Sequence, residues 1–225
     1  MVAAPRTRQR HAGSQAGFTL IEFMIAAAIT TAVLGGAVVL ATQLQQSYST
    51  ELDDAAVGDE GRFALDWIAR VMRSAGSNPY SITLSPCPDA NTAFQGIRLD
   101  PNGNGLEDDV RVQADINPTD GALVGSAGDC TQEREDITIA HNPDELTITK
   151  RDRGSADPAA VVTMTEPIFT QLLFTYLDSS RAVTTAVNSI AYAQIVVTGQ
   201  SKARNPITGQ YTPFSYDTEV RLRGQ

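Results

Sequence analysis

A single carboxylate, Glu22, interrupts an otherwise apolar run at residues 18–42. A charge inside a membrane segment costs at least about 2.5 kcal/mol on insertion scales, so such a residue usually serves a function and has a partner. For a carboxylate the natural partner is an ammonium group, supplied by another subunit or by the chain's own N-terminus. The alternative is an acid near the membrane edge that reaches toward water.

A second group of chemical interest is the segment DPNGNGLEDD at residues 100–109, where oxygen-bearing side chains alternate and a Gly follows the third of them. This spacing is similar to the start of a calcium loop, although position twelve is Arg111 where an EF-hand has a bidentate Glu, and no helices are expected to flank it. The alternative is a solvated turn. The expected ligands are the side chains of Asp100, Asn102 and Asn104, the carbonyl oxygen of Leu106, and Asp108 or Asp109.

A looser oxygen-rich stretch follows and is a weaker candidate for the same ion, Ca²⁺. Its members are Asp115, Asn117 and Asp120, with Glu133 and Glu135 beyond them. Asp and Asn are also common in turns because they tolerate positive φ, so a solvated turn is again the alternative. The acidic balance of the chain, with a formal net charge of −9, favours divalent cations over nucleic acid as partners.

No catalytic set can be assembled from the sequence, so we expect a protein that is not an enzyme. Outside the first seventeen residues the only histidine is His141, and the GxSxG, HExxH and Gly-rich phosphate-loop motifs are absent. Neighbouring carboxylates such as those at 107–109 do not define the separation that acid–base catalysis needs.

The two cysteines, Cys87 and Cys130, lie in neither a CxxC motif nor a Cys/His cluster, which argues against a zinc or redox site. In an exported domain we expect them to form a disulfide. A loop of this length would stabilise the fold by roughly 3–4 kcal/mol in the chain-entropy picture. Two unpaired buried thiols are the alternative.

The element that carries Glu22 is predicted to be a membrane-spanning helix. The 25 residues at 18–42 would span about 37 Å as a helix, enough for a hydrocarbon core of about 30 Å. The run continues as helix instead of ending at a small-x-small cleavage site, unlike an ordinary secretory signal. Arg6, Arg8 and Arg10 precede the span and acids follow it, so the C-terminal part is expected in the periplasm.

The sequence GFTLIEFMIAAA, which begins at Gly17, resembles the N-terminal motif of prepilins, the precursors of type IV pilins and of type II secretion pseudopilins. The resemblance implies that Gly17 is the last residue of a leader that a prepilin peptidase cuts on the cytoplasmic side. It implies that Phe18 becomes the N-methylated terminus. Glu22 would compensate the positive amine of a neighbouring subunit in the filament.

Beyond the membrane the helical pattern continues as an amphipathic segment. Apolar residues recur at helical spacing through 52–75, and Gly76 and Pro79 are expected to end the helix. The stretch at 61–76 is similar to the corresponding helix of PilW-type minor pilins. Glycines at 35–36, 58 and 61 would either weaken the helix or allow close packing.

The rest of the chain is predicted to form strands separated by Gly, Pro, Asn and Asp, with a hairpin turn at 142–144. The expected fold is α+β and pilin-like, with a long N-terminal helix packed on an antiparallel sheet. The expected parts are a leader at 1–17, a transmembrane helix at 18–46, an amphipathic continuation at 47–78 and a β-rich head at 79–225. The expected strands are 94–99, 110–114, 136–140, 145–150, 161–165, 168–177, 190–198 and 214–222.

The resemblance to prepilins, together with these features, implies a minor pilin of a type IV pilus, anchored in the bacterial inner membrane and later part of the pilus at the cell surface. Its expected partners are a prepilin peptidase, other major and minor pilins, and the inner-membrane assembly platform. A GspJ-like pseudopilin of type II secretion is one alternative. Another is a pilus-displayed adhesin that uses loops at 80–93 and 117–132.

Overall fold

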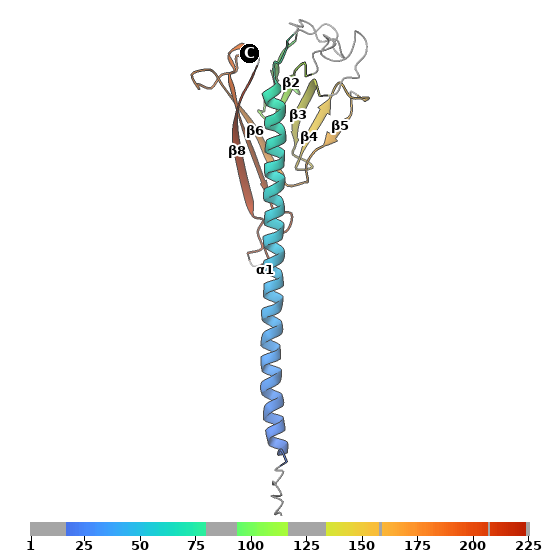
Figure 1. Cartoon of the computed structure of the whole chain (residues 1–225), viewed down its shortest axis with the longest axis vertical. Coiled ribbons are helices and arrows are strands. Elements are labelled where there is room, and N and C mark those ends of the chain that lie inside the picture. The colour runs from blue at the N-terminus through green and yellow to red at the C-terminus, as the bar shows by residue number, and fades with distance from the viewer. Residues whose placement is uncertain (1–16, 80–93, 117–133, 158, 207, 224–225) are drawn as a thin grey trace, which may run out of the picture. The chain divides into compact units, whose positions relative to one another are not determined.

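The computed structural model describes residues 17–79, 94–116, 134–157, 159–206 and 208–223. Contacts within the chain divide it into two compact units, Met1–Tyr48 and Ser49–Gln225. A single helix, α1 (Leu20–Ser74), begins in the first unit and ends in the second. The predicted α+β architecture, one long N-terminal helix with antiparallel sheets, is confirmed (Figure 1).

Within the second unit, α1 buries one face. Its buried residues are spaced three or four apart, which places them on the same side of the helix. The helix ends as the sequence predicts: Gly76 takes a left-handed φ of 76°, and its backbone N–H donates to the carbonyl of Gln113. The buried residues of α1 are Val57, Gly61, Ala64, Ile68, Ala69 and Met72.

In the described part of the chain, eight strands follow the helix, and each overlaps one that the sequence predicts. They form two antiparallel sheets instead of the single sheet expected: a five-stranded sheet in the order β1-β2-β3-β4-β5 and a three-stranded sheet in the order β6-β7-β8. The bounds are β1 (Ile97–Leu99), β2 (Asp109–Gln113), β3 (Asp136–Asn142), β4 (Thr147–Asp152), β5 (Val161–Thr163), β6 (Phe169–Leu177), β7 (Tyr192–Gln200) and β8 (Pro213–Arg221).

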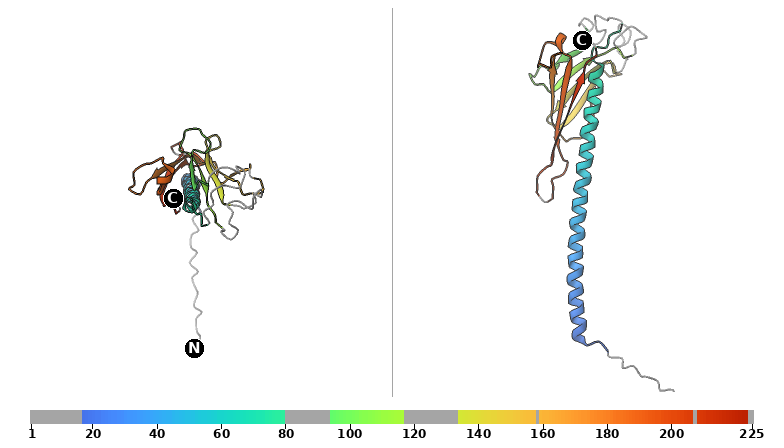
Figure 2. Two further views of the ribbon diagram at one scale, coloured as in Figure 1. Left: turned by 90° about the horizontal axis from the view of Figure 1, so that it is seen from above. Right: turned by 60° about the vertical axis from the view of Figure 1, so that its left-hand side comes forward.

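Strand β6 connects the two sheets through backbone hydrogen bonds. The N–H of Phe169 donates to the carbonyl of Leu146, and the N–H of Phe174 donates to that of Glu107. Viewed from above, the strands of the two sheets lie on opposite sides of the end of α1 (Figure 2). The core therefore forms between the helix and both sheets, and includes Ile68 and Met72 of α1, Ile139 of β3, Phe174 of β6 and Ile195 of β7.

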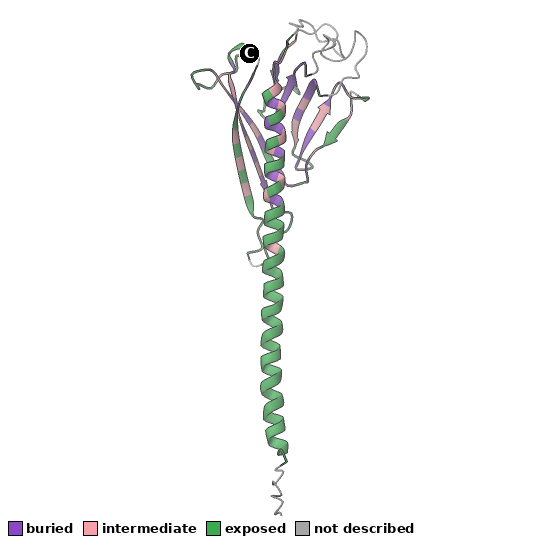
Figure 3. Cartoon of the chain, viewed as in Figure 1, coloured by how far each residue is buried: buried purple, intermediate pink, exposed green. Residues whose placement is uncertain are grey.

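Successive side chains of a strand point to opposite faces of its sheet, and this alternation explains which strand residues are buried. β7 alternates half-buried and buried residues along its whole length, as a strand covered on one face does. In Figure 3 the buried residues of α1 lie in its C-terminal part, whereas its N-terminal part is exposed throughout. β5 is shorter than predicted and exposed throughout. The expected strand extends to Thr165, but the hydroxyl oxygen of that residue accepts a hydrogen bond from the N–H of Ile148 and so leaves the regular ladder.

Candidate functional site

At its N-terminus, α1 is closed by a capping box formed by Thr19 and Glu22. The backbone N–H and the hydroxyl of Thr19 both donate to one carboxylate oxygen of Glu22 at 2.9 Å. In return the N–H of Glu22 approaches the Thr19 hydroxyl oxygen at 3.3 Å. This reciprocal pairing satisfies two amide groups that a helix start leaves without partners. Glu22 therefore has a local structural role that the sequence analysis did not anticipate, although the Thr-x-x-Glu spacing indicates it.

The second oxygen of that carboxylate forms no hydrogen bond among the described residues. Phe18 and Ile21, which lie near Glu22 in the sequence, are apolar and exposed, at 92% and 67%. Capping therefore leaves the charge of Glu22 in place with part of its bonding capacity open. A second partner can still bind there.

Gly17 and Phe18 lie just before the helix, in exposed backbone. A Cβ added at Gly17 would meet no atom within 4 Å, so packing inside the protein does not require glycine at this position. A requirement for glycine would have to come from an external agent that reads or cuts this segment. The structure brings Gly17, Phe18 and Glu22 within about one turn of the helix start.

Residues 17–49 are all exposed. The helix is long and apolar enough to cross a membrane, judged by length and composition, among the residues that the structure describes. An exposed apolar surface of this length needs a cover of lipid or of other apolar helices.

Residues 13–38 match the prokaryotic N-terminal methylation motif. This is the prepilin motif, and its match supports a type IV pilin-like or pseudopilin protein. The motif indicates a structural pilin subunit and, together with the apolar helix, fits an inner-membrane-anchored pilin. It also implies processing by prepilin peptidase and assembly with other pilins. No curated protein and no solved structure matched the chain.

In the head, the loop between β1 and β2 brings the predicted oxygen ligands together around its own backbone. The two carboxylate oxygens of Asp100 accept the N–H groups of Asn104 and Gly105, both at 2.9 Å. The amide oxygen of Asn102 accepts from Asn104 at 2.9 Å, and that of Asn104 accepts from Leu106 at 2.8 Å. The side chains at loop positions one, three and five therefore turn inward.

Three residues of the loop have a left-handed backbone: Asp100, Gly103, whose φ is 73°, and Gly105. Gly105 has a φ of 77°, as the sixth position of a calcium loop requires. Asp100 has a φ of 44°, a costly value for a residue with a Cβ. No group of three or more His, Cys, Asp or Glu side chains is placed to hold a metal among the described residues. Any cation here would have to use asparagine and carbonyl oxygens as well.

The deepest residue of this loop is Asp109, only 1% exposed. One of its carboxylate oxygens accepts the N–H of Asn102 at 3.1 Å, and the other has no hydrogen-bond partner within the described part of the chain. Burial, and then the nearby charges of Asp108 and Asp100, raise the pKa of the Asp109 carboxyl to about 6.

Arg111 stands at the twelfth position of the loop, but its side chain is not a ligand and pairs with a carboxylate on the neighbouring strand. Its guanidinium makes a bidentate ion pair with Asp136 of β3, at 2.7 and 2.6 Å, and both side chains are buried. Gln113 donates a further hydrogen bond to the same carboxylate. Sequence reasoning did not find this pair because the two residues are 25 positions apart and meet only through the register of β2 and β3.

The remaining candidates are only partly described. In the second oxygen-rich stretch, Asp115 and Glu135 are buried and the N–H of Ile116 donates to Glu135, whereas Asn117, Asp120 and Glu133 lie outside the described residues. Cys87 and Cys130 also lie outside them, so the disulfide stays a prediction. His141 contacts the carbonyl of Phe169 through its Nε2 at 2.9 Å, a structural role on β3.

Proposed function

We propose that this chain is a minor pilin, a low-abundance structural subunit of a type IV pilus. A prepilin peptidase would cut after Gly17 and methylate Phe18, with the head facing the periplasm. The assembly platform of the inner membrane would then move the subunit into the filament beside other pilins. The observation that carries this proposal is the prepilin motif at 13–38 placed at the start of an uncovered apolar helix.

The capping box adds a physical requirement to this proposal. The new amine of Phe18 would stand four residues before Glu22, while one oxygen of that carboxylate is already held by Thr19. The other oxygen remains able to pair with the ammonium group of an adjacent subunit once the apolar helices pack together. Desolvation among such helices would make this pairing strong and would penalise a subunit that lacks it.

Three variants separate the capping role of Glu22 from its charge. Glu22→Gln keeps an oxygen that can cap Thr19 but removes the charge, Thr19→Ala removes the capping hydroxyl but keeps the charge, and Glu22→Ala removes both. We expect all three to be cleaved and inserted in cells. The amount of each variant in sheared filaments, relative to the membrane pool, is the measurement.

If the charge drives assembly, the amount of both Glu22 variants in filaments falls at least about tenfold, while that of Thr19→Ala stays near the native level. A tenfold loss corresponds to about 1.4 kcal/mol, a modest value for a desolvated ion pair. Native incorporation of Glu22→Gln together with poor incorporation of Thr19→Ala would instead assign Glu22 to helix capping alone.

A pseudopilin of type II secretion is the nearest alternative, since the same motif supports both. Deleting the gene distinguishes them: the minor-pilin proposal predicts loss of surface pili with exoprotein secretion intact. The adhesin hypothesis depends on loops at 80–93 and 117–132, which lie outside the described residues. It predicts normal filaments that fail to attach.

A further inference from the structure

We propose that the loop at residues 100–109 is a calcium site whose buried end is the carboxylate of Asp109. The proposed ligands are oxygens from one continuous hairpin loop: the side chains of Asp100, Asn102, Asn104 and Asp109 and the carbonyl of Leu106, with waters completing the shell. All are hard oxygen donors, which Ca²⁺ binds in sets of six to eight.

The loop is already folded around a centre. Asp100 binds two loop amides through both of its oxygens, and Asn104 donates from its side-chain nitrogen toward Asp108 at 3.4 Å. A carboxylate oxygen that accepts one N–H keeps a second lone pair, so these contacts leave the ligands able to bind a cation. Because two amide oxygens and one carbonyl contribute, the site needs fewer carboxylates than a compact acidic cluster would.

Two buried side-chain oxygens, one from each sheet, have no hydrogen-bond partner among the described residues. One oxygen of Asp109 has no hydrogen-bond partner among the described residues although the residue is 1% exposed. The hydroxyl of Tyr176, which comes from β6 in the other sheet, is likewise buried and unpartnered there. Tyr176 lies two residues along β6 from Phe174, whose N–H donates to the carbonyl of Glu107 in the loop, and the rings of Phe174 and Tyr176 stack with their centroids 6.4 Å apart.

Leaving buried oxygens of this kind unsatisfied costs about 1–3 kcal/mol each, and more for a charged group. Most buried polar atoms in native proteins are therefore paired. A divalent cation held by Asp109 would compensate its buried charge directly, and the waters that Ca²⁺ carries can bond to neighbouring oxygens such as the Tyr176 hydroxyl.

The position of the loop predicts what calcium would do. Glu107 accepts the N–H of Phe174 in β6 at 2.8 Å, and Asp108 accepts the N–H of His141 in β3 at 3.1 Å. The loop thus joins the five-stranded sheet to the three-stranded sheet. A cation bound inside it would hold these two carbonyls in place and stabilise the joint between the sheets.

The test measures the melting temperature of the full chain in detergent. The fluorescence of Trp67, which packs against the core, reports the unfolding. Extracellular calcium modules bind with dissociation constants of roughly 10⁻⁴ to 10⁻³ M, so 10 mM CaCl₂ should raise Tm by about 5 °C relative to a chelator. The same concentration of MgCl₂ should give a much smaller shift, because Mg²⁺ prefers a tighter octahedral site.

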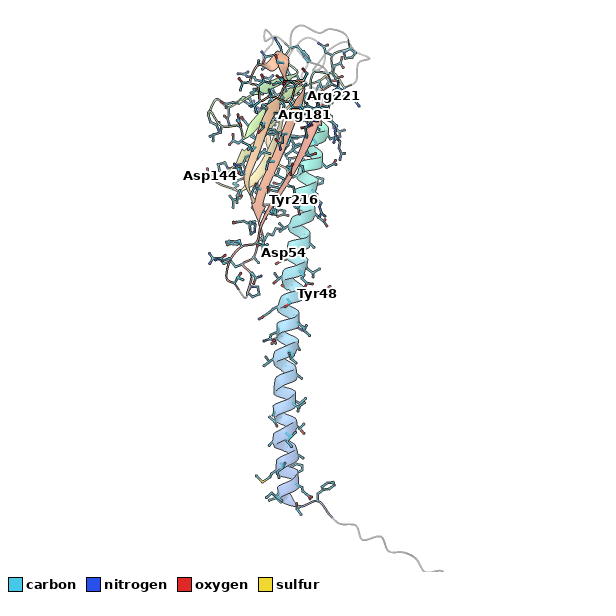
Figure 4. The ribbon with its side chains drawn as sticks, turned by 90° about the vertical axis from the view of Figure 1, so that its left-hand side faces the viewer. Tyr48, Asp54, Asp144, Arg181, Tyr216 and Arg221 are labelled. Carbon is cyan, nitrogen blue, oxygen red and sulfur yellow. The ribbon has the colours of Figure 1, made fainter. Side chains whose placement is uncertain are left out.

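Asp100→Asn and Asp109→Asn should each abolish the calcium shift. In chelator, Asp109→Asn should melt at or above the native temperature, since it removes a buried charge without changing the shape of the side chain. The matched control is Asp144→Asn, in the exposed turn between β3 and β4 (Figure 4), which should keep the full shift.

The proposal is overturned if CaCl₂ up to 10 mM leaves Tm unchanged and calorimetry detects no binding. It is overturned equally if MgCl₂ reproduces the whole shift, or if Asp109→Asn keeps it. None of these results bears on the pilin proposal, since filament incorporation and calcium binding are measured separately.

Discussion

Arg111 and Asp136 form an ion pair in which both side chains are almost completely buried. Its two hydrogen bonds of 2.6–2.7 Å join neighbouring strands, and Gln113 binds the same carboxylate. A buried pair contributes little compared with an apolar replacement, but losing one partner leaves the other charge desolvated.

We therefore expect Asp136→Ala to lower the free energy of unfolding by about 3–5 kcal/mol. The matched control is Asp66→Ala, which removes the exposed partner of Arg70 on α1 and should cost less than about 1 kcal/mol. Chemical denaturation followed by Trp67 fluorescence measures both. Similar losses in the two variants would contradict the assignment of Asp136 as a structural anchor.

At the level of the elements, the contact between α1 and β8 depends on a glycine in the helix. A Cβ at Gly61 would lie 2.8 Å from the ring of Tyr216, which Figure 4 shows beside the helix. In β7, a Cβ at Gly199 would lie 2.4 Å from the carbonyl oxygen of Ile168 and from the ring of Phe214. Gly61 lets α1 approach the aromatic side chains of β8 closely, and Gly199 makes room for the Ile168 carbonyl and the Phe214 ring, so close packing accounts for the glycine at residue 61.

We expect Gly199→Ala to destabilise the head most and Gly61→Ala less, whereas Gly36→Ala should leave its stability unchanged. At Gly199 the added Cβ would collide with the backbone carbonyl of Ile168, which cannot move away. The overpacking should therefore lower the free energy of unfolding by about 2–3 kcal/mol. At Gly61 the Tyr216 ring can shift, and the gain of about 1 kcal/mol in helix propensity offsets part of the cost. At Gly36 a Cβ meets nothing within 4 Å. Melting temperatures of the three variants test the order, and a Gly61→Ala protein more stable than the native chain would contradict close packing.

Sequence patterns predicted those parts of the fold that depend on neighbouring residues. Apolar spacing located α1 and all eight strands, and Asn142 caps the predicted turn through the N–H groups of Asp144 and Glu145. The division into two sheets was not predicted, because it depends on β6 pairing with β7 while meeting the first sheet only at isolated backbone bonds. The burial of Asp109 was missed for the same reason: a loop sequence does not reveal which strand lies beneath it.

At the scale of the whole molecule, the two units have different needs. The second unit has its own core of helix and sheet residues, whereas residues 17–49 leave every apolar side chain uncovered. Burial of apolar surface stabilises by about 25 cal/mol per Å², so a long exposed apolar helix gains far more from lipid or from neighbouring helices than from water. A membrane followed by a filament supplies both covers in turn, and the prepilin motif lies at the end of the helix where processing would occur.

The most direct test of this account is mass spectrometry of the N-terminal peptide of the protein isolated from its own cells. The account predicts a chain that begins at Phe18, carries one methyl group on its amine, and lacks residues 1–17. A Gly17→Leu variant should retain the leader and migrate more slowly on a gel. A native protein that begins at Met1, or at any residue other than an N-methylated Phe18, would contradict the account.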